Sequence, residues 1–442
     1  MFWWLIPLVI VLLPAVLIAV WALSMRRNMP WQNIVAVTSN LKIKISPALR
    51  KYALSGDRDY STLPDPLIME DGTAVQTQEQ FEQRRSEILS LFSHYVYGML
   101  PKEGFTTSFE VVEQGDALEG NAVRKQVKIT TSTSKGASDA LMLLYLPKQT
   151  KKCPVIVGLN FRGNHTVLDD PAIIPSYTID TSDEKWEEKR GSAAARWNIV
   201  ESISRGYAVA CIHSADLAPD KKDQYNSRVV ALFDDAEFKA VGAWAFGILR
   251  GVDYLLQEDA VSHDHIAVVG HSRLGKAALW AAANDTRIGM VLSNDAGNTG
   301  SSLSRGNHGE TVCTINMGMP HWFCSNYYAF GKNENALPVD QNLLLAAIAP
   351  RKLYIGNAED DLWADPQGSF NALQSAKKAF ALYYDEVLPD ELQTYPEVNT
   401  AFFCQSMGIH LRSGWHDIQA ADWKFYLDYM DRYFIAKETE NA

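Results

Sequence analysis

The sequence has few cysteines, no excess of basic residues and no internal repeat or low-complexity tract. Five cysteines occur in 442 residues and no two form a C-x-x-C pair, so neither a zinc ribbon nor a redox motif is expected. Acidic residues outnumber Lys and Arg by 52 to 41, a formal net charge of −11, which argues against nucleic-acid binding because that needs a basic face. With 47% hydrophobic and 21% charged residues, the composition is that of a globular protein.

One long hydrophobic run lies at the N-terminus, "MFWWLIPLVIVLLPAVLIAVWAL". It is long enough to span a bilayer and lacks the basic n-region of a typical signal peptide. We therefore predict an uncleaved membrane anchor, or a signal-like segment, over residues 1–24. A linker over 25–62 and one globular domain over 63–442 follow. Arg26 and Arg27 come directly after the run and favour a cytoplasmic side for the domain.

Apolar strand-like runs alternate with helical runs through the rest of the chain, after a predicted helix at residues 77–98 and several strands with turns at Gly115-Asp116 and Gly120-Asn121. This alternation predicts an α/β fold, a mostly parallel sheet with helices on both faces in three layers. The expected strands are "CPVIVGLNF", "RGYAVACIH", "HIAVVGHS", "IGMVLSNDAG" and "RKLYIGNAEDD", and the expected helices are "FKAVGAWAFGILRGVDYLLQE", "GKAALWAAAND", "QNLLLAAIAP" and "DWKFYLDYMDRYF".

Ser272 stands between the strand "IAVVG" and the helix "GKAALWAAA". An α/β-hydrolase places its nucleophile at this strand-to-helix turn, where the helix N-terminus offers free N–H groups to an oxyanion. Gly270 and Gly275 would let the chain turn sharply there. The competing interpretation is that Ser272 caps the helix, a common role for serine.

A serine nucleophile needs a base, and in this fold the chain order is Ser, then acid, then His. His416 lies in a glycine-containing loop before the last helix, where the base is expected, and His410 is the competitor. Asp361 follows the strand "KLYIG", and Asp295 follows the strand "GMVLS". Acids in such loops commonly form turns, so both remain candidates.

The sequence resembles the bacterial glucuronoyl esterases, carbohydrate esterase family fifteen, from about Leu63 to Phe434. The resemblance lies in "GLNFRGNHTV", "RGYAVACIHSADLAPD", "GHSRLGKAALWAAA", "GETV…MPHWFCSNY", "LPVDQNLLLAAIAPRKLYIGNAEDDLWADPQG" and "HLRSGWHD". It implies an α/β-hydrolase fold and a serine esterase with no metal and no cofactor. The implied substrate is the ester between (4-O-methyl-)D-glucuronic acid of glucuronoxylan and a lignin alcohol.

The resemblance also implies roles for single residues. Ser272 would be the nucleophile and form the acyl-enzyme, His416 the base, and Arg273 a stabiliser of the oxyanion. The residues expected at the uronic acid ring are Lys276, Glu310 and Trp363. Without the resemblance we would expect these three to be a solvated lysine, an exposed loop acid and a core tryptophan.

The acid is less clear, because the family places it at either of two positions. Some members have a Glu at the position of Asp295, and others use an acid at the position of Asp361. This sequence has Asp at both, and Asp is one methylene shorter than Glu. We favour Asp361.

Two other functions remain open: a carbohydrate esterase that removes acetyl groups, and a catalytically inactive, membrane-tethered glycan-binding module. The retained Ser272 and His416 argue against the inactive module. A polymeric substrate requires a catalytic domain that faces outward, into the periplasm or the extracellular space. The two arginines after the anchor favour the opposite orientation, and we give the substrate argument more weight. We also expect a monomer.

Overall fold

The computed structural model describes residues 58–182, 184–233, 238–389, 392 and 395–435. The predicted membrane anchor at 1–24 lies outside the described residues, as does most of the predicted linker. Within the part of the chain that is described, no helix has the length and apolar character needed to cross a bilayer.

The last residues of the predicted linker contact the domain. The guanidinium of Arg58 forms a buried ion pair with Asp365, with distances of 2.5 and 2.7 Å to its two carboxylate oxygens. Asn371 donates to the hydroxyl of Tyr60 at 2.8 Å. The packed region therefore begins a few residues before the expected boundary at residue 63.

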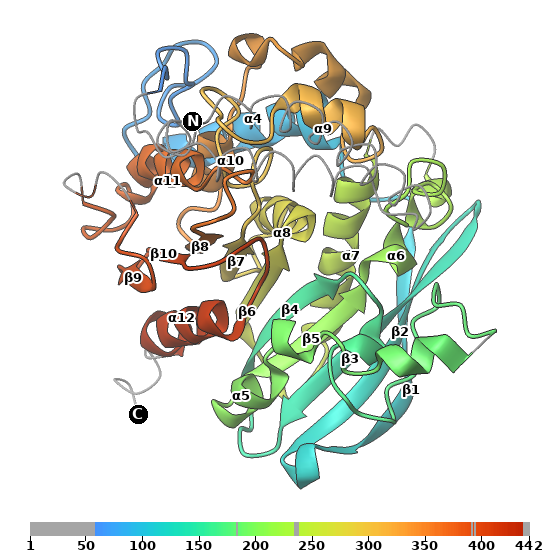
Figure 1. Cartoon of the computed structure of the whole chain (residues 1–442). Helices are drawn as coiled ribbons and strands as arrows, with labels where there is room; N and C mark the ends of the chain where they lie inside the picture. The colour runs from blue at the N-terminus through green and yellow to red at the C-terminus, as the bar shows by residue number, and fades with distance from the viewer. Residues whose placement is uncertain (1–57, 183, 234–237, 390–391, 393–394, 436–442) are drawn as a thin grey trace, which may run out of the picture. The chain divides into compact units, whose positions relative to one another are not determined.

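The described residues form a ten-stranded sheet in the order β1-β2-β3-β5-β4-β6-β7-β8-β10-β9 (Figure 1). The six strands from β5 to β10 in this order are parallel, and the strands at both edges are antiparallel. The strands are β1 (Thr106–Ala117), β2 (Ala122–Thr133), β3 (Gly136–Pro147), β4 (Cys153–Asn160), β5 (Ala208–His213), β6 (Val261–His271), β7 (Met290–Asn294), β8 (Lys352–Ala358), β9 (Thr400–Phe403) and β10 (Met407–Arg412).

One of the two predicted turns near the start of the sheet is wrong. Gly115 and Asp116 continue β1 and pair with Arg124 and Val123 of β2, so the Gly-Asp dipeptide lies within a strand. The turn at Gly120-Asn121 is confirmed, since the chain reverses between β1 and β2 there. The φ of Gly120 is +87°, which a glycine adopts without steric cost.

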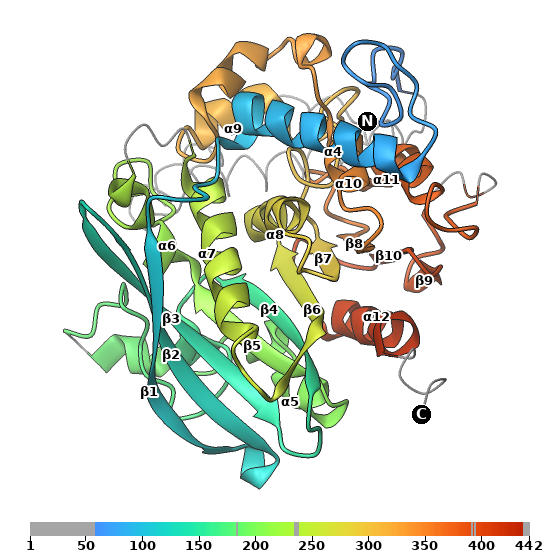
Figure 2. The same cartoon turned by 180° about the vertical axis from the view of Figure 1, so that it is seen from behind.

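Helices cover both faces of the sheet, as Figures 1 and 2 show from opposite sides. The α-helices are α4 (Gln78–Phe92), α5 (Ile199–Ser204), α6 (Ser214–Leu217), α7 (Ala240–Leu255), α8 (Arg273–Asn284), α9 (Val312–Gly318), α10 (Gln341–Ala346), α11 (Pro366–Phe380) and α12 (Ala420–Met430). Shorter 3₁₀ or π turns are η1 (Ser93–Tyr97), η2 (Leu118–Gly120), η3 (Asn164–Thr166), η4 (Glu184–Lys189), η5 (Ala194–Arg196), η6 (Val229–Leu232), η7 (Ser325–Phe330), η8 (Glu334–Ala336) and η9 (Asp431–Ile435).

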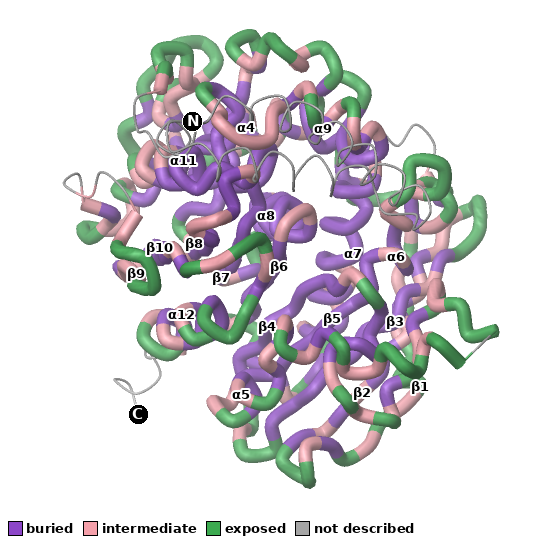
Figure 3. Tube along the Cα trace, in the orientation of Figure 1, coloured by how far each residue is buried: buried purple, intermediate pink, exposed green. Residues whose placement is uncertain are grey.

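Two hydrophobic cores lie on the two sides of the sheet. Along β6, Ile266 and Val268 belong to the core under α7 and α8, while Ala267 and Val269 belong to the core under α5 and α12. This alternation follows from the two-residue period of a strand. Figure 3 shows the central strands and the inner helices α7 and α8 as buried and the edge strands β1 and β9 as more exposed, in agreement with the predicted three-layer α/β-hydrolase architecture.

The site lies at the carboxyl ends of the parallel strands. β4 lies between β5 and β6, so the strand order reverses there, and an open α/β sheet forms its crevice at such a point. Five loops at this edge carry polar or aromatic residues considered below: Phe161 after β4, Ser272 after β6, Asp295 after β7, Asp361 after β8 and His416 after β10.

Candidate active site

Ser272 occupies a strained turn between β6 and α8. Its φ is +58° and its ψ is −132°, a conformation that non-glycine residues rarely adopt. Gly270 makes the turn possible, because a Cβ there would lie 2.2 Å from the carbonyl oxygen of Leu274. The Ser272 side chain makes no capping hydrogen bond to α8. The helix-cap interpretation of this serine is therefore wrong.

The hydroxyl of Ser272 instead contacts a histidine and, through it, an acid. Ser272 Oγ lies 2.9 Å from His416 Nε2, and His416 Nδ1 lies 2.5 Å from Asp361 Oδ2. The Asp361 side chain is 1% exposed, whereas that of His416 is 42% exposed. The predicted nucleophile, base and favoured acid are thus brought into one hydrogen-bonded row.

The environment of His416 favours its protonated form. Partial removal from water lowers the pKa of the imidazole, but the Asp361 carboxylate and its hydrogen bond raise it by more, so the pKa lies above its usual 6.5. A hydrogen-bonded carboxylate also fixes the tautomer, leaving Nε2 free to accept a proton from Ser272. The arrangement can therefore perform general base catalysis.

Asp295 lies beside the same histidine but makes different contacts. One ligand atom from each of Asp295, Asp361 and His416 falls within 4.8 Å of the other two. Asp295 Oδ1 accepts from the backbone N–H of Ala358 at 2.8 Å. Burial and the neighbouring Asp361 carboxylate raise the pKa of Asp295 well above its usual value. The raised pKa favours the protonated form of the Asp295 carboxyl.

The competing base, His410, belongs to the buried structure. Its Nε2 lies 2.9 Å from Asp422 Oδ1 and its Nδ1 lies 3.1 Å from the hydroxyl of Tyr354. The ring is fully buried in β10. Both nitrogens are thus engaged in the core, and His416 is the histidine that meets Ser272.

Arg412, which the sequence analysis did not single out, holds the loop that carries His416. Its side chain is 1% exposed and donates to the backbone carbonyls of Ser413 at 3.0 Å, Trp415 at 2.9 Å and Asp417. The same guanidinium forms an ion pair with Asp422 at 2.7 Å. The signal in the sequence was an arginine inside "HLRSGWHD", but the buried acid that neutralises it could not be assigned from spacing.

Arg273 begins α8 and is held by an acid that the sequence analysis also missed. Arg273 Nε lies 2.6 Å from Asp220 Oδ2, and its guanidinium packs over the rings of Phe161 at 4.8 Å and Trp322 at 5.8 Å. The indole N–H of Trp322 donates to Asp220 at 2.7 Å. These contacts fix a cation next to the nucleophile.

Lys276, Glu310 and Trp363 lie together. Lys276 Nζ lies 3.2 Å from Glu310 Oε2 and donates to the carbonyl of Asn298. Lys276 is only 2% exposed, so the expectation of a solvated lysine is wrong. Burial lowers its pKa, and the Glu310 carboxylate opposes this effect in part. The backbone N–H of Glu310 donates to the carbonyl of Trp363 at 2.8 Å.

His416 has no nitrogen left for a metal ion while the row is intact. Its Nε2 faces Ser272 and its Nδ1 faces Asp361. A cation bound by the two aspartates and His416 would therefore have to displace one of these hydrogen bonds. The donor set is better suited to moving a proton than to coordination.

Comparisons with known proteins agree on one family. A family described as "Glucuronyl esterase, fungi" matches residues 192–383. The chain is 39% identical to carbohydrate esterase MZ0003 from an unknown prokaryotic organism, over 84% of this chain and 89% of that protein. It is 26% identical to a 4-O-methyl-glucuronoyl methylesterase of Schizophyllum commune, over 72% and 73%. The solved structure of a glucuronoyl esterase from Solibacter usitatus superposes with a TM-score of 0.78 and 33% identity, covering 85% of this chain and 99% of the other.

Proposed function

The chain belongs to the glucuronoyl esterase family, carbohydrate esterase family 15, and from this premise we propose that it hydrolyses esters of (4-O-methyl-)D-glucuronic acid. The ester would join the uronic acid side chains of glucuronoxylan to lignin alcohols. The observation that carries the proposal is the hydrogen-bonded row Ser272–His416–Asp361, which lies beside the cations Arg273 and Lys276. As a family member, the protein is a carboxylic ester hydrolase.

Acylation follows from the geometry of the row. His416 Nε2 takes the proton of Ser272, whose Oγ attacks the ester carbonyl. The carbonyl oxygen becomes an oxyanion, which Arg273 and the free N–H groups of the first turn of α8 stabilise. His416 then donates its proton to the leaving alcohol. Asp361 stabilises the imidazolium that exists between these two transfers.

Deacylation uses the same groups in reverse. A water molecule gives a proton to His416 and attacks the acyl carbon, and the protonated His416 returns this proton to Ser272 Oγ as the bond breaks. The product is a free uronate. Its carboxylate is attracted to Arg273 and Lys276, so release of the product is a candidate for the slow step.

The uronic acid ring is assigned to the side of Lys276, Glu310 and Trp363. A lysine and a carboxylate 3.2 Å apart offer a donor and an acceptor to neighbouring ring hydroxyls. Trp363 remains partly exposed, so its indole can pack against the face of a sugar. Because Lys276 is buried, an N–H group of its ammonium without an acceptor would cost free energy. An acyl group that carries hydroxyls can supply such an acceptor.

An acetyl esterase is the second candidate, because the name of the relative MZ0003 specifies a carbohydrate esterase without naming the ester it cleaves. The test is to compare kcat/KM of the full chain on benzyl D-glucuronate and on an aryl acetate. We expect turnover of the uronate ester, and the Trp363→Ala variant should lose about tenfold on it, equivalent to roughly 1.4 kcal/mol of lost contact.

The aryl acetate is the internal control for this variant, since it has no ring for Trp363 to contact. Equal losses on both esters would remove Trp363 from the uronate site. Turnover of acetyl esters alone would reject the main proposal in favour of the acetyl esterase.

We further propose that residues 1–24 tether the chain to a membrane with the catalytic domain outside, and that the chain acts as a monomer. The support is chemical, because a xylan–lignin polymer cannot reach an enzyme enclosed by a membrane. Protease access to the domain on intact cells tests the orientation.

A further inference from the structure

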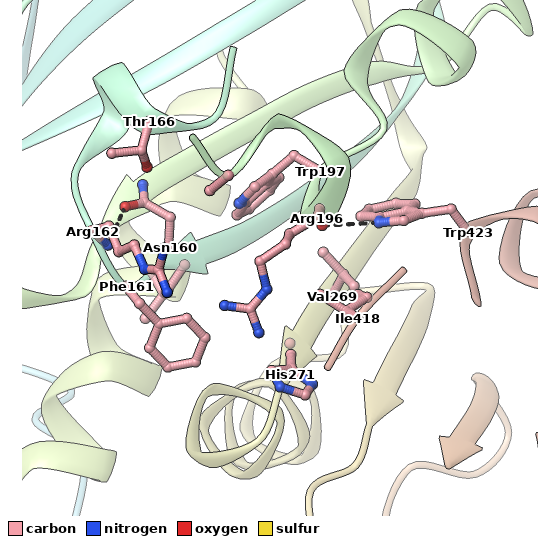
Figure 4. Close-up of a pocket in the computed structure, with 13 residues that line it drawn as sticks. Asn160, Phe161, Arg162, Thr166, Arg196, Trp197, Val269, His271, Ile418 and Trp423 are labelled. Carbon is pink, nitrogen blue, oxygen red and sulfur yellow. Dashed lines mark hydrogen bonds between the residues drawn. The ribbon is translucent and has the colours of Figure 1, made fainter. Parts of the chain in front are cut away.

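A small hollow lies next to the Ser272–His416 pair and contains none of the residues assigned to the uronic acid (Figure 4). It encloses about 30 Å³, room for two or three water molecules, which each need roughly 10–15 Å³. A benzyl ring would therefore have to lie across its mouth. The lining includes Phe161 and Arg162 after β4, Arg196 and Trp197 before α5, and His271 and Ile418 beside the catalytic pair.

The position of the hollow beside His416 points to the alcohol side of the ester. His271 directly precedes Ser272, and its ring lies 4.6 Å from the ring of His416, centroid to centroid. Ile418 follows His416 by two residues. An ester has an acyl side and an alcohol side, and His416 protonates the alcohol as it leaves. Because Lys276, Glu310 and Trp363 are assigned to the acyl side, the hollow by His416 is left for the alcohol.

Two guanidinium groups pack over Phe161 at this place, and a third arginine, Arg162, follows it in the chain. Arg273 and Arg196 pack over its ring at 4.8 and 5.6 Å, and Figure 4 shows Arg196 extending between Phe161 and Val269 toward His271. Burial lowers the pKa of Arg196, and the positive charges of Arg162 and Arg273 add to this effect. The three cations therefore repel one another.

Carboxylates offset two of these three charges. Arg273 pairs with Asp220 at 2.6 Å, and Arg196 Nε pairs with Asp417 at 2.7 Å. Arg162 is exposed and has no ion-pair partner among the residues that the structure describes. One positive charge is thus left at the mouth of the hollow, on a chain whose net charge is −11.

The proposed reaction does not account for this charge. The uronic acid is esterified and neutral at its carbonyl, and the oxyanion that forms there is met by Arg273 and α8. Neither step needs Arg162 or Arg196. Guanidinium groups around an aromatic ring suit a ligand that is itself aromatic and anionic, because they pair with its charge and stack on its face.

We propose that Phe161, Arg162 and Arg196 form a subsite for the leaving alcohol that prefers an aromatic alcohol carrying an ionised carboxylate. The ring would lie against Phe161, and the carboxylate would meet Arg162 and the remaining N–H groups of Arg196. This inference rests on the proposed glucuronoyl esterase activity and specifies the alcohol half of its substrate.

The test compares benzyl D-glucuronate with 4-carboxybenzyl D-glucuronate at low ionic strength. The measured quantity is the ratio of kcat/KM for the two esters on the same protein, so differences in overall activity between variants cancel. We expect the full chain to prefer the carboxybenzyl ester by about two- to fivefold, the effect of a partly exposed ion pair of up to about 1 kcal/mol, since both esters carry the same ring. The Arg162→Gln variant should lose most of this preference.

Lys222→Gln is the matched control, because it removes the same charge from an exposed residue outside the hollow and should keep the preference. Arg196→Lys keeps the positive charge at position 196. The ratio of kcat/KM for the carboxybenzyl and benzyl esters should therefore stay higher in this variant than in Arg162→Gln. Equal rates on both esters in the full chain, or a preference that survives in Arg162→Gln, would overturn the subsite while leaving the esterase activity standing. Failure to hydrolyse either ester would overturn the proposed function and the subsite with it.

Discussion

At the residue scale, two buried aspartates lie beside His416, and their contacts differ. Asp361 makes a 2.5 Å hydrogen bond to His416 Nδ1, whereas Asp295 bonds the backbone of Ala358 and lies 3.5 Å from Arg412 Nη2. Burial raises the pKa of Asp295, and repulsion from the neighbouring Asp361 carboxylate adds to this effect. The hydrogen bond to His416 therefore makes Asp361 the acid of the row, and the raised pKa of Asp295 favours its protonated form.

The Asp361→Asn variant should lose activity by about 10²–10³-fold in kcat, less than the roughly 10⁴-fold loss seen for such a change in a serine protease. The loss is smaller because Asp295 would ionise once Asp361 is neutral. His416 must be unprotonated to act as base, so activity falls as the pH drops through its raised pKa. Removal of the Asp361 charge lowers that pKa, and the acid limb of the pH–rate profile should move to lower pH.

Asp295→Asn is the matched comparison for this prediction. Because Asp295 is expected to be protonated, its amide is electrostatically similar, and the loss in kcat should stay below about tenfold. A larger loss in Asp295→Asn than in Asp361→Asn would reverse the assignment of the triad acid.

Single residues were predictable from the sequence where chain order carries the information. Ser272, an acid after a later strand and His416 before the last helix follow the order of an α/β-hydrolase. Asp220 and Arg412 were not predictable, because their charges are matched by Arg273 and Asp422 through the fold. Spacing in the sequence does not show which buried charges meet.

At the element scale, the loop between β10 and α12 determines where His416 lies. Arg412 at the end of β10 donates to three carbonyls of this loop and pairs with Asp422 in the first turn of α12. Asp422 also binds Asn294 at the end of β7, and Asn294 Oδ1 lies 2.6 Å from His271 Nδ1. A buried polar network thus joins β6, the strand that directly precedes Ser272, to the loop that carries its base.

Arg412→Lys should lower kcat by about 10- to 100-fold with little change in KM, because a lysine cannot reach the acid and three carbonyls at once. The loop would then hold His416 less well, while the substrate contacts of Lys276 and Trp363 remain. Steady-state kinetics and a thermal melt measured together separate this effect from unfolding. A kcat within twofold of the parent, in a folded protein, would show that Arg412 does not position the base.

Helices and strands with a strong hydrophobic pattern were predicted correctly from the sequence. Elements that depended on a weak local signal were not. The apolar runs of β4, β5, β6 and β7 are all strands, since buried parallel strands read as continuous apolar segments. The prediction of a turn at Gly115-Asp116 was wrong because Gly and Asp also occur in paired edge strands. There, pairing with the neighbouring strand determines the backbone conformation. The buried role of His410 depends on α12 packing over β10, which local sequence does not reveal.

At the scale of the whole molecule, the charge around the active site is opposite in sign to the net charge of the chain. The chain carries a formal charge of −11, yet the arginines around Phe161 and the buried Lys276 surround the nucleophile with cations. Composition could exclude a basic nucleic-acid-binding surface but could not locate this cluster. An oxyanion, a uronate product and an anionic alcohol all benefit from such a field.

The most direct test of the central claim is kcat/KM of the full chain and of its Ser272→Ala variant on benzyl D-glucuronate, with Ser227→Ala on the exposed surface as control. We predict turnover by the parent and the control. Loss in Ser272→Ala should approach the roughly 10⁶-fold found for the serine nucleophile of subtilisin, so its rate should fall to the detection limit. Full activity in Ser272→Ala would contradict the account.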